Sequence, residues 1–157
     1  MAAQTYRVKS KKLSPLHTAV VRLACPPSQI GEAFRGIMPE VIDCISRQGC
    51  SASGAPFARF FDYAVEQADF EAGVPVSTPL AAQGRVEPGR LPGGRVARSV
   101  HRGPYDGLQH AHDAIGDWVL AHDHDPAGPV WEVYVKGPQH GEDSSRWETE
   151  VVWPLRK

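Results

Sequence analysis

Hydrophobic residues along this chain follow a strand-like spacing and then a helix-like spacing, and this succession occurs twice. His17–Leu23 is rich in strand-forming residues and is followed by consecutive prolines. Apolar residues then recur every three or four positions, which predicts a single bent helix that is capped by Ser28, contains Pro39 and ends near Gly49. Its predicted buried residues are Ile30, Phe34, Ile37, Met38, Val41 and Ile45.

Two further strands complete the first succession. Pro56–Val65 and Ala68–Val76 alternate aromatic or β-branched residues with polar ones, and a short polar turn separates them. The next stretch, Ser77–Pro92, is rich in glycine, proline and alanine, which predicts an irregular connection.

The same order of elements then returns. Gly94–His101 alternates like a strand, and the Gly-Pro-Tyr-Asp sequence beginning at Gly103 opens a helix. Val130–Val135 and Trp147–Trp153 form the closing strand pair. The predicted buried residues of the second helix are Leu108, Ala111, Ile115, Trp118, Val119 and His122.

This repetition predicts an α+β fold built from duplicated strand–helix–strand–strand units. We expect one domain over residues 1–157, with a first repeat at 1–78, a connection at 79–92 and a second repeat at 93–157. Two such units related by pseudo-twofold symmetry would form a mainly antiparallel sheet with two helices on one face. A ligand groove is expected between the halves.

Alternation along the strands predicts which residues line that groove. Alignment of the halves pairs Arg59 with Glu132 and Phe61 with Tyr134. We expect Trp131 and its alternate neighbours to lie under the helices, which turns the other set outward. The predicted outward face contains Arg59, Phe61, Tyr63, Glu132, Tyr134 and Glu150, with open space at Gly73. Aromatic rings beside a carboxylate suit a flat, apolar and often cationic ligand.

Composition and charge further limit the classes of function that the chain can have. The chain has 157 residues, of which 41% are hydrophobic, and its formal net charge of −1 argues against nucleic-acid binding. No apolar run approaches the roughly 18 residues that a membrane span needs, and the cysteines indicate a reduced, cytoplasmic protein. Seven histidines occur without zinc-type spacing, and the glycine-rich segment lacks a phosphate-loop lysine, so we expect no metal and no cofactor.

The second half also carries a diagnostic set of motifs. These are the His-x-Gly-Pro-Tyr sequence from His101 to Tyr105, the helix containing Trp118, the strand from Pro129 to Tyr134, and Thr149-Glu150. Together they resemble the GyrI-like small-molecule-binding family, which includes the C-terminal effector-binding domains of transcription regulators. The first half matches this family more loosely.

The resemblance implies a groove lined by aromatic residues around a key glutamate. That glutamate is Glu132 or Glu150, and the supporting aromatic residues are Phe61, Tyr105, Tyr134 and Trp147. Independently of the family, His101 is expected to orient the turn that follows it rather than to act in catalysis.

Three functions remain open from the sequence. The first is a free-standing binder of small aromatic or cationic molecules, without direct DNA binding because no helix-turn-helix segment precedes the domain. The second is a hydrolase that opens the cyclopropane of DNA-alkylating compounds, with Glu132 or Glu150 and Tyr134 as candidate catalytic residues. The third is an interaction protein that resembles a gyrase inhibitor, with DNA gyrase or a regulator as its partner.

Overall fold

The helices and strands follow the predicted order in the computed structural model, which describes residues 4–138, 141 and 143–156. The helices are α1 (Ile30–Arg47) and α2 (Leu108–Ala121). The strands are β1 (Lys9–Leu13), β2 (Leu16–Cys25), β3 (Phe57–Tyr63), β4 (Ala68–Pro75), β5 (Glu87–Leu91), β6 (Gly94–Arg102), β7 (Asp125–Pro126), β8 (Val130–Lys136) and β9 (Glu148–Arg156). Strand–helix–strand–strand therefore occurs twice, as β2-α1-β3-β4 and as β6-α2-β8-β9, and the fold is α+β.

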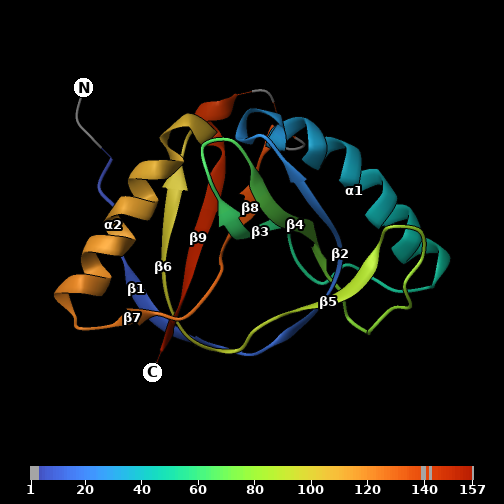
Figure 1. Cartoon of the computed structure of the whole chain (residues 1–157), viewed down its shortest axis with the longest axis horizontal. Coiled ribbons are helices and arrows are strands. Elements are labelled where there is room, and N and C mark those ends of the chain that lie inside the picture. Colours follow the sequence, from blue (N-terminus) through green and yellow to red (C-terminus); the bar gives the residue numbers. More distant parts are fainter. Residues whose placement is uncertain (1–3, 139–140, 142, 157) are drawn as a thin grey trace. The chain divides into compact units, whose positions relative to one another are not determined.

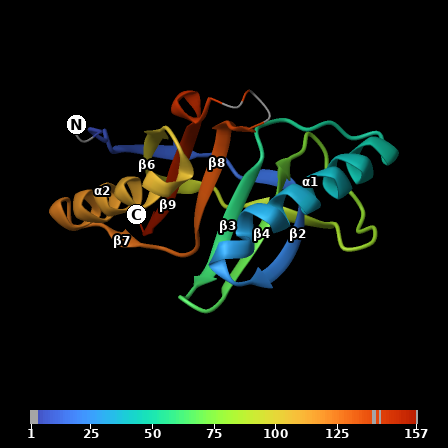
Figure 2. The same cartoon turned by 90° about the horizontal axis from the view of Figure 1, so that it is seen from above.

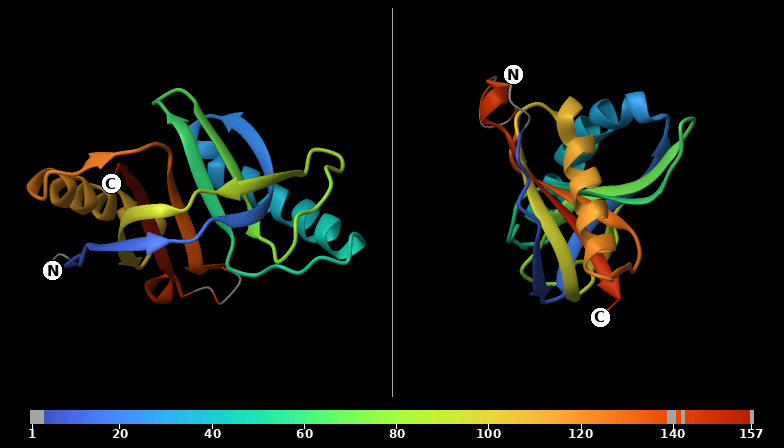
Figure 3. Two further views of the ribbon diagram at one scale, coloured as in Figure 1. Left: turned by 90° about the horizontal axis from the view of Figure 1, so that it is seen from below. Right: turned by 90° about the vertical axis from the view of Figure 1, so that its left-hand side faces the viewer.

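The chain divides into two compact units, each of which contains one of the two strand–helix–strand–strand successions. The first-repeat unit is Ser14–Gly93, and the second-repeat unit combines Met1–Leu13 with Gly94–Lys157. Strand β1 belongs to the second-repeat unit because it pairs antiparallel with β6, beside which it runs in Figure 3. Its lysines are exposed, as expected for a solvated edge strand.

In the second-repeat unit the strands are antiparallel in the order β1-β6-β9-β8, and β7 pairs with the end of β9. Helix α2 packs on β6 and β9 (Figure 1). The core under the helix consists of Ala97, Leu108, Ala111, Ile115, Val119, Val151 and Leu155. His122, which was predicted to be buried, is exposed because α2 ends at Ala121.

In the first-repeat unit the antiparallel order is β3-β4-β2-β5, and α1 packs on β2 and β4 (Figure 2). Helix α1 continues through Pro39 as predicted and buries Ile37, Val41, Cys44 and Ile45. A turn of 3-10 helix occupies Pro27–Gln29, so Ser28 does not cap α1.

The predicted irregular connection contains a strand that the sequence did not indicate. Strand β5 pairs with β2 from Leu91 opposite Leu16 to Glu87 opposite Val20. Its proline and glycine made the segment resemble a loop, but proline is tolerated in a strand at the edge of a sheet.

His101 holds the turn after β6, as the sequence predicted. Its Nε2 lies 2.8 Å from the carbonyl oxygen of Pro104, which requires an N–H at that position. In a neutral imidazole Nδ1 is then an acceptor, and the hydroxyl of Tyr6, 2.8 Å away, donates to it. His101 is 4% exposed, so both contacts are shielded from water.

The substitution Tyr6→Phe should lower the free energy of unfolding by about 1–3 kcal/mol, because it leaves a buried acceptor on His101 without a donor. Chemical denaturation monitored by tryptophan fluorescence measures this change. Tyr63→Phe is a matched control. Because Tyr63 is 62% exposed, loss of its hydroxyl should change the free energy of unfolding by less than about 0.5 kcal/mol. Equal effects of the two substitutions would contradict the role given to Tyr6.

Candidate functional site

A buried carboxylate in the second-repeat unit lies at the centre of a chain of hydrogen bonds. Glu132 on β8 is 8% exposed. Its Oε2 is 2.7 Å from Nε2 of His112 on α2, and its Oε1 accepts the hydroxyl of Tyr134 at 2.8 Å. Nδ1 of His112 in turn accepts the indole N–H of Trp153 at 3.0 Å. The two hydrogen bonds to Glu132 suit an ionised carboxylate, which accepts and does not donate.

Strand register explains why Glu132 meets a helix. Glu132 lies opposite Val151, and Tyr134 lies opposite Thr149. Residues directly opposite each other in an antiparallel pair share a face, and Val151 belongs to the core under α2. The prediction that Glu132 and Tyr134 point away from the helices is therefore wrong. The alternation along β8 correctly placed Glu132 and Tyr134 on one face of the strand. The apolar Trp131 on the other face was expected to lie under the helices, and this assigned Glu132 and Tyr134 to the wrong side of the sheet.

Aromatic rings surround this carboxylate. The rings of Tyr105 and Tyr134 make an edge contact with centroids 5.6 Å apart, and Trp147 lies 4.9 Å from Tyr105. Burial raises the pKa of Tyr134 well above its ordinary value, and the nearby Glu132 raises it further. The pKa of Tyr105 is raised by the same two causes. We call Glu132 with Tyr105, Tyr134 and Trp147 the aromatic site.

The ion-pair partner of Glu132 distinguishes it from the other paired carboxylates. In the described part of the chain, each of the others pairs with at least one arginine, as Glu71 does with Arg59 and Glu40 with Arg85. Glu132 instead contacts His112, which carries a charge only when protonated. Its negative charge thus lacks a permanent cation among these contacts, although the residue is buried.

Glu150 does not share a face with Glu132. It lies opposite Val133 on β8, on the side of the sheet away from α2. Its Oε2 is 3.0 Å from the guanidinium of Arg98, so its charge is already compensated. The predicted grouping of both glutamates on one face is therefore incorrect, because neighbouring positions of β8 oppose Val151 and Glu150.

The predicted residues of the first repeat lie together in the first-repeat unit. The guanidiniums of Arg22 and Arg59 lie 4.1 Å and 5.2 Å from the ring centroid of Phe61. Arg59 also lies 3.8 Å from Glu71, whose pKa is raised by burial. Tyr63 is exposed at the end of β3.

Register also changes how the two repeats correspond. Arg59 lies opposite Glu71 on β4, whereas Val133 lies opposite Glu150 on β9. When these two pairs are aligned, Glu132 corresponds to Ala58. The predicted alignment, which matched Glu132 with Arg59, was therefore shifted by one position. The carboxylate of the aromatic site has thus no counterpart at the matching position of the first repeat.

His112 is the site residue that sequence reasoning missed. It was set aside with His110 because two histidines two positions apart on a helix cannot share one ion. The missed signal is its position next to Ala111 and one turn before Ile115 and Gly116, at the border of the buried face. A histidine at such a border can reach the sheet beneath the helix.

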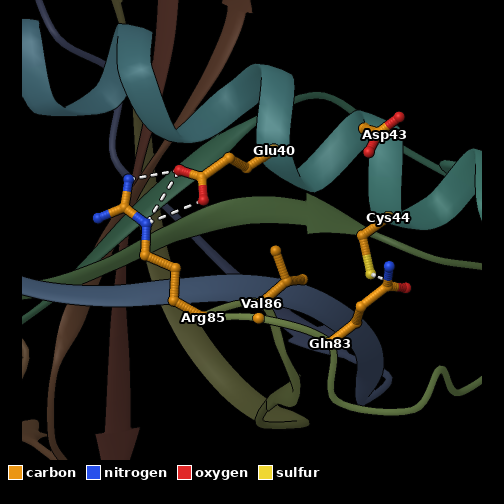
Figure 4. Close-up of a pocket in the computed structure, with 7 residues that line it drawn as sticks. Glu40, Asp43, Cys44, Gln83, Arg85 and Val86 are labelled. Atoms are coloured by element: carbon orange, nitrogen blue, oxygen red, sulfur yellow. Dashed lines mark hydrogen bonds and ion pairs between the residues drawn. The ribbon is translucent and has the colours of Figure 1, made fainter.

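A separate pocket of about 140 Å³ lies in the first-repeat unit (Figure 4). It lies between α1 and the turn at residues 83–86, where Arg85 forms a two-pronged ion pair with Glu40. The predicted site residues lie on other elements. Among the described residues, no cluster of three or more His, Cys, Asp or Glu side chains is arranged to hold a metal ion.

The sequence matches the GyrI-like small molecule binding domain over residues 7–156, and the chain belongs to this family. It is similar in structure to the C-terminal domain of EcmrR, with a TM-score of 0.88 and 21% identity over 98% of this chain and 99% of that one. It covers only 58% of the EcmrR chain seen in a complex with DNA. No curated protein sequence matches the chain.

Two more distant structures share the fold. A hydrolase encoded by lin2189 from Listeria innocua has a TM-score of 0.68 and 11% identity, over 96% of this chain and 92% of that one. SAV2435, solved with bound tetraphenylphosphonium, has a TM-score of 0.63 and 10% identity, over 96% and 94%. In the described part of this chain, neither helix is both long and apolar enough to cross a membrane.

Proposed function

We propose that the small molecule bound by this member of the family is a flat aromatic cation, and that the aromatic site binds it. The observation that carries this proposal is the buried carboxylate of Glu132, which contacts a histidine where other carboxylates contact arginine. A cationic ligand would supply the missing counter-charge. The neighbouring rings of Tyr105, Tyr134 and Trp147 would add stacking and cation–π contacts.

The tetraphenylphosphonium bound to SAV2435 is an aromatic cation, which is in keeping with this ligand class. That structure is only 10% identical to this chain, and the contacts of Glu132 in this chain itself are the support for a cationic ligand.

Two isoelectronic probes distinguish the effect of a ligand's charge on binding from the effect of its shape. N-methylacridinium carries a permanent positive charge, and 9-methylanthracene has the same ring outline without it. We expect saturable binding of the cation, followed by fluorescence quenching and calorimetry, at least about tenfold tighter than binding of the neutral probe. Equal affinities would refute a role for charge, and failure of both probes to bind would count against the proposed function.

Hydrolysis is a second candidate, favoured by the hydrogen bond between Tyr134 and Glu132. In this reaction Glu132 would take a proton from water while the water oxygen bonds to a cyclopropane carbon. The ring bond would break, its electrons would move to a conjugated oxygen, and the proton held by Glu132 would pass to that oxygen and restore the carboxylate. Incubation with a spirocyclopropyl cyclohexadienone and mass spectrometry tests this reaction. Product one water heavier than the substrate supports a hydrolase, and recovery of bound, unchanged compound supports a binder.

A further inference from the structure

One buried polar side chain of the second-repeat unit has no hydrogen-bond partner among the described residues. Thr149 on β9 is 0% exposed, and its hydroxyl oxygen is shielded from water. The other buried polar side chains of this unit, Ser99, His101 and Glu132, each form at least one hydrogen bond. Because an unpaired buried hydroxyl is unfavourable, its presence indicates a partner that the described chain does not supply.

Thr149 lies at the aromatic site. It is opposite Tyr134 on β8, so the two side chains are on the same face of the sheet. Val151, two positions further along β9, belongs to the core under α2, which places this face toward the helix. The ring of Tyr105 contacts the ring of Tyr134, opposite Thr149, and the ring of Trp147, two positions before it. The unpaired hydroxyl therefore lies among the residues that line the aromatic site.

We propose that Thr149 is a specificity-determining residue of the aromatic site, whose hydroxyl accepts a hydrogen bond from an amino group on the ring of the cationic ligand. This inference rests on the proposed function and names the ligand class more closely. An amino group conjugated with a cationic ring shares its positive charge, so its N–H groups are strong donors and its nitrogen is a poor acceptor. A threonine hydroxyl has the lone pairs to accept such a bond. Glu132 thus compensates the charge of the ligand, and Thr149 selects its substituent.

The ring of Tyr105 controls access to this hydroxyl. Tyr105 is only partly buried, and it lies in the turn of 3-10 helix Tyr105–Gly107 that precedes α2. Its ring is in contact with the rings on both sides of Thr149. A change of the Tyr105 rotamer would uncover the hydroxyl, and the displaced ring could still stack on the bound ligand.

The test compares permanently charged probes that differ in one substituent. We choose 3-amino- and 9-amino-N-methylacridinium, each beside the compound with a methyl group in place of the amino group, which is similar in size and has no N–H. For at least one pair, the wild type should bind the amino compound about five- to tenfold more tightly than the methyl compound, as one buried hydrogen bond implies. Calorimetry measures this ratio. The substitution Thr149→Val should reduce it to about one, because valine keeps the branched shape without the hydroxyl.

Thr18→Val is the matched control. Thr18 also has a buried hydroxyl without a hydrogen-bond partner among the described residues, but it belongs to the first-repeat unit, so its substitution should leave the ratio unchanged. Wild-type ratios near one for both pairs would overturn the proposal, because the hydroxyl would then serve no ligand. A ratio that persists in Thr149→Val would overturn it as well. Failure of every acridinium probe to bind would instead refute the proposed function.

NMR of the wild type provides a second measurement that does not depend on the folding of a variant. In protein with carbon-13-labelled threonine methyl groups, the protons of the bound amino compound should show a nuclear Overhauser effect to the methyl group of Thr149 and none to that of Thr18. Binding of the compound without an effect at Thr149 would refute the role of this residue and leave the proposed function intact.

Discussion

Replacing Glu132 by Gln should weaken binding of N-methylacridinium by about ten- to a hundredfold, which corresponds to about 1.4–2.8 kcal/mol. The substitution removes the negative charge of the aromatic site without changing its shape. Binding of 9-methylanthracene should change by less than about twofold, because stacking on Tyr105, Tyr134 and Trp147 does not depend on that charge. Calorimetric titration of both probes against both proteins measures the difference.

Gln is a suitable replacement because it can keep both hydrogen bonds. Its amide oxygen can accept the Nε2–H of His112, and its amide N–H can donate to the hydroxyl oxygen of Tyr134. The hydroxyl of Tyr134 then no longer donates to residue 132, so chemical denaturation of the variant should accompany the titrations. A loss of affinity in the folded variant reports the charge.

Glu150→Gln is the matched control for this experiment. Glu150 pairs with Arg98 on the other side of the sheet, so its substitution should alter cation affinity by less than about twofold. If Glu150→Gln weakened binding as much as Glu132→Gln, or if neither did so, Glu132 would not be the acid that recognises the ligand.

The sequence predicted the repeated order of elements because each helix and strand carries a regular period of apolar residues. The buried faces of the helices were largely correct, as Val41 and Ile45 in α1 and Ile115 and Val119 in α2 show. Strand β5 was missed because a strand at the edge of a sheet can contain proline and need not alternate regularly between apolar and polar residues.

The site was harder to predict, because alternation does not say which side of a strand meets a helix. On β8 the hydrogen-bonded Glu132 and Tyr134 lie beneath α2, while Trp131 lies on the opposite face. The sequence alone shows no reason to bury a carboxylate under a helix. That reason is His112, which lies 20 residues away and meets Glu132 only in the folded chain, where β8 pairs with β9 and α2 packs on β9. The rings of Tyr105 and Trp147, which the family resemblance indicated, have their centroids 4.9 Å apart.

Gly73 has a different role from the one predicted. It was expected to leave open space on an outward face, but it lies between Val20 of β2 and Phe57 of β3 in a closely packed part of β4. A Cβ atom at this position would lie 1.8 Å from the carbonyl oxygen of Ala19 and 2.9 Å from Cα of Val20. Both obstacles are backbone atoms of the paired strand, which no change of rotamer can move away. The glycine therefore permits β2 and β4 to approach, and it does not provide a cavity.

Gly73→Ala should consequently lower the free energy of unfolding by at least about 3 kcal/mol, because the two paired strands must separate to admit one methyl group. Gly36→Ala is a control of opposite sign, since a Cβ there meets nothing within 4 Å and alanine favours a helix interior over glycine by about 1 kcal/mol. Chemical denaturation of both variants measures these changes. If Gly73→Ala were as stable as the wild type, the close approach of β2 and β4 at this position would be incorrect.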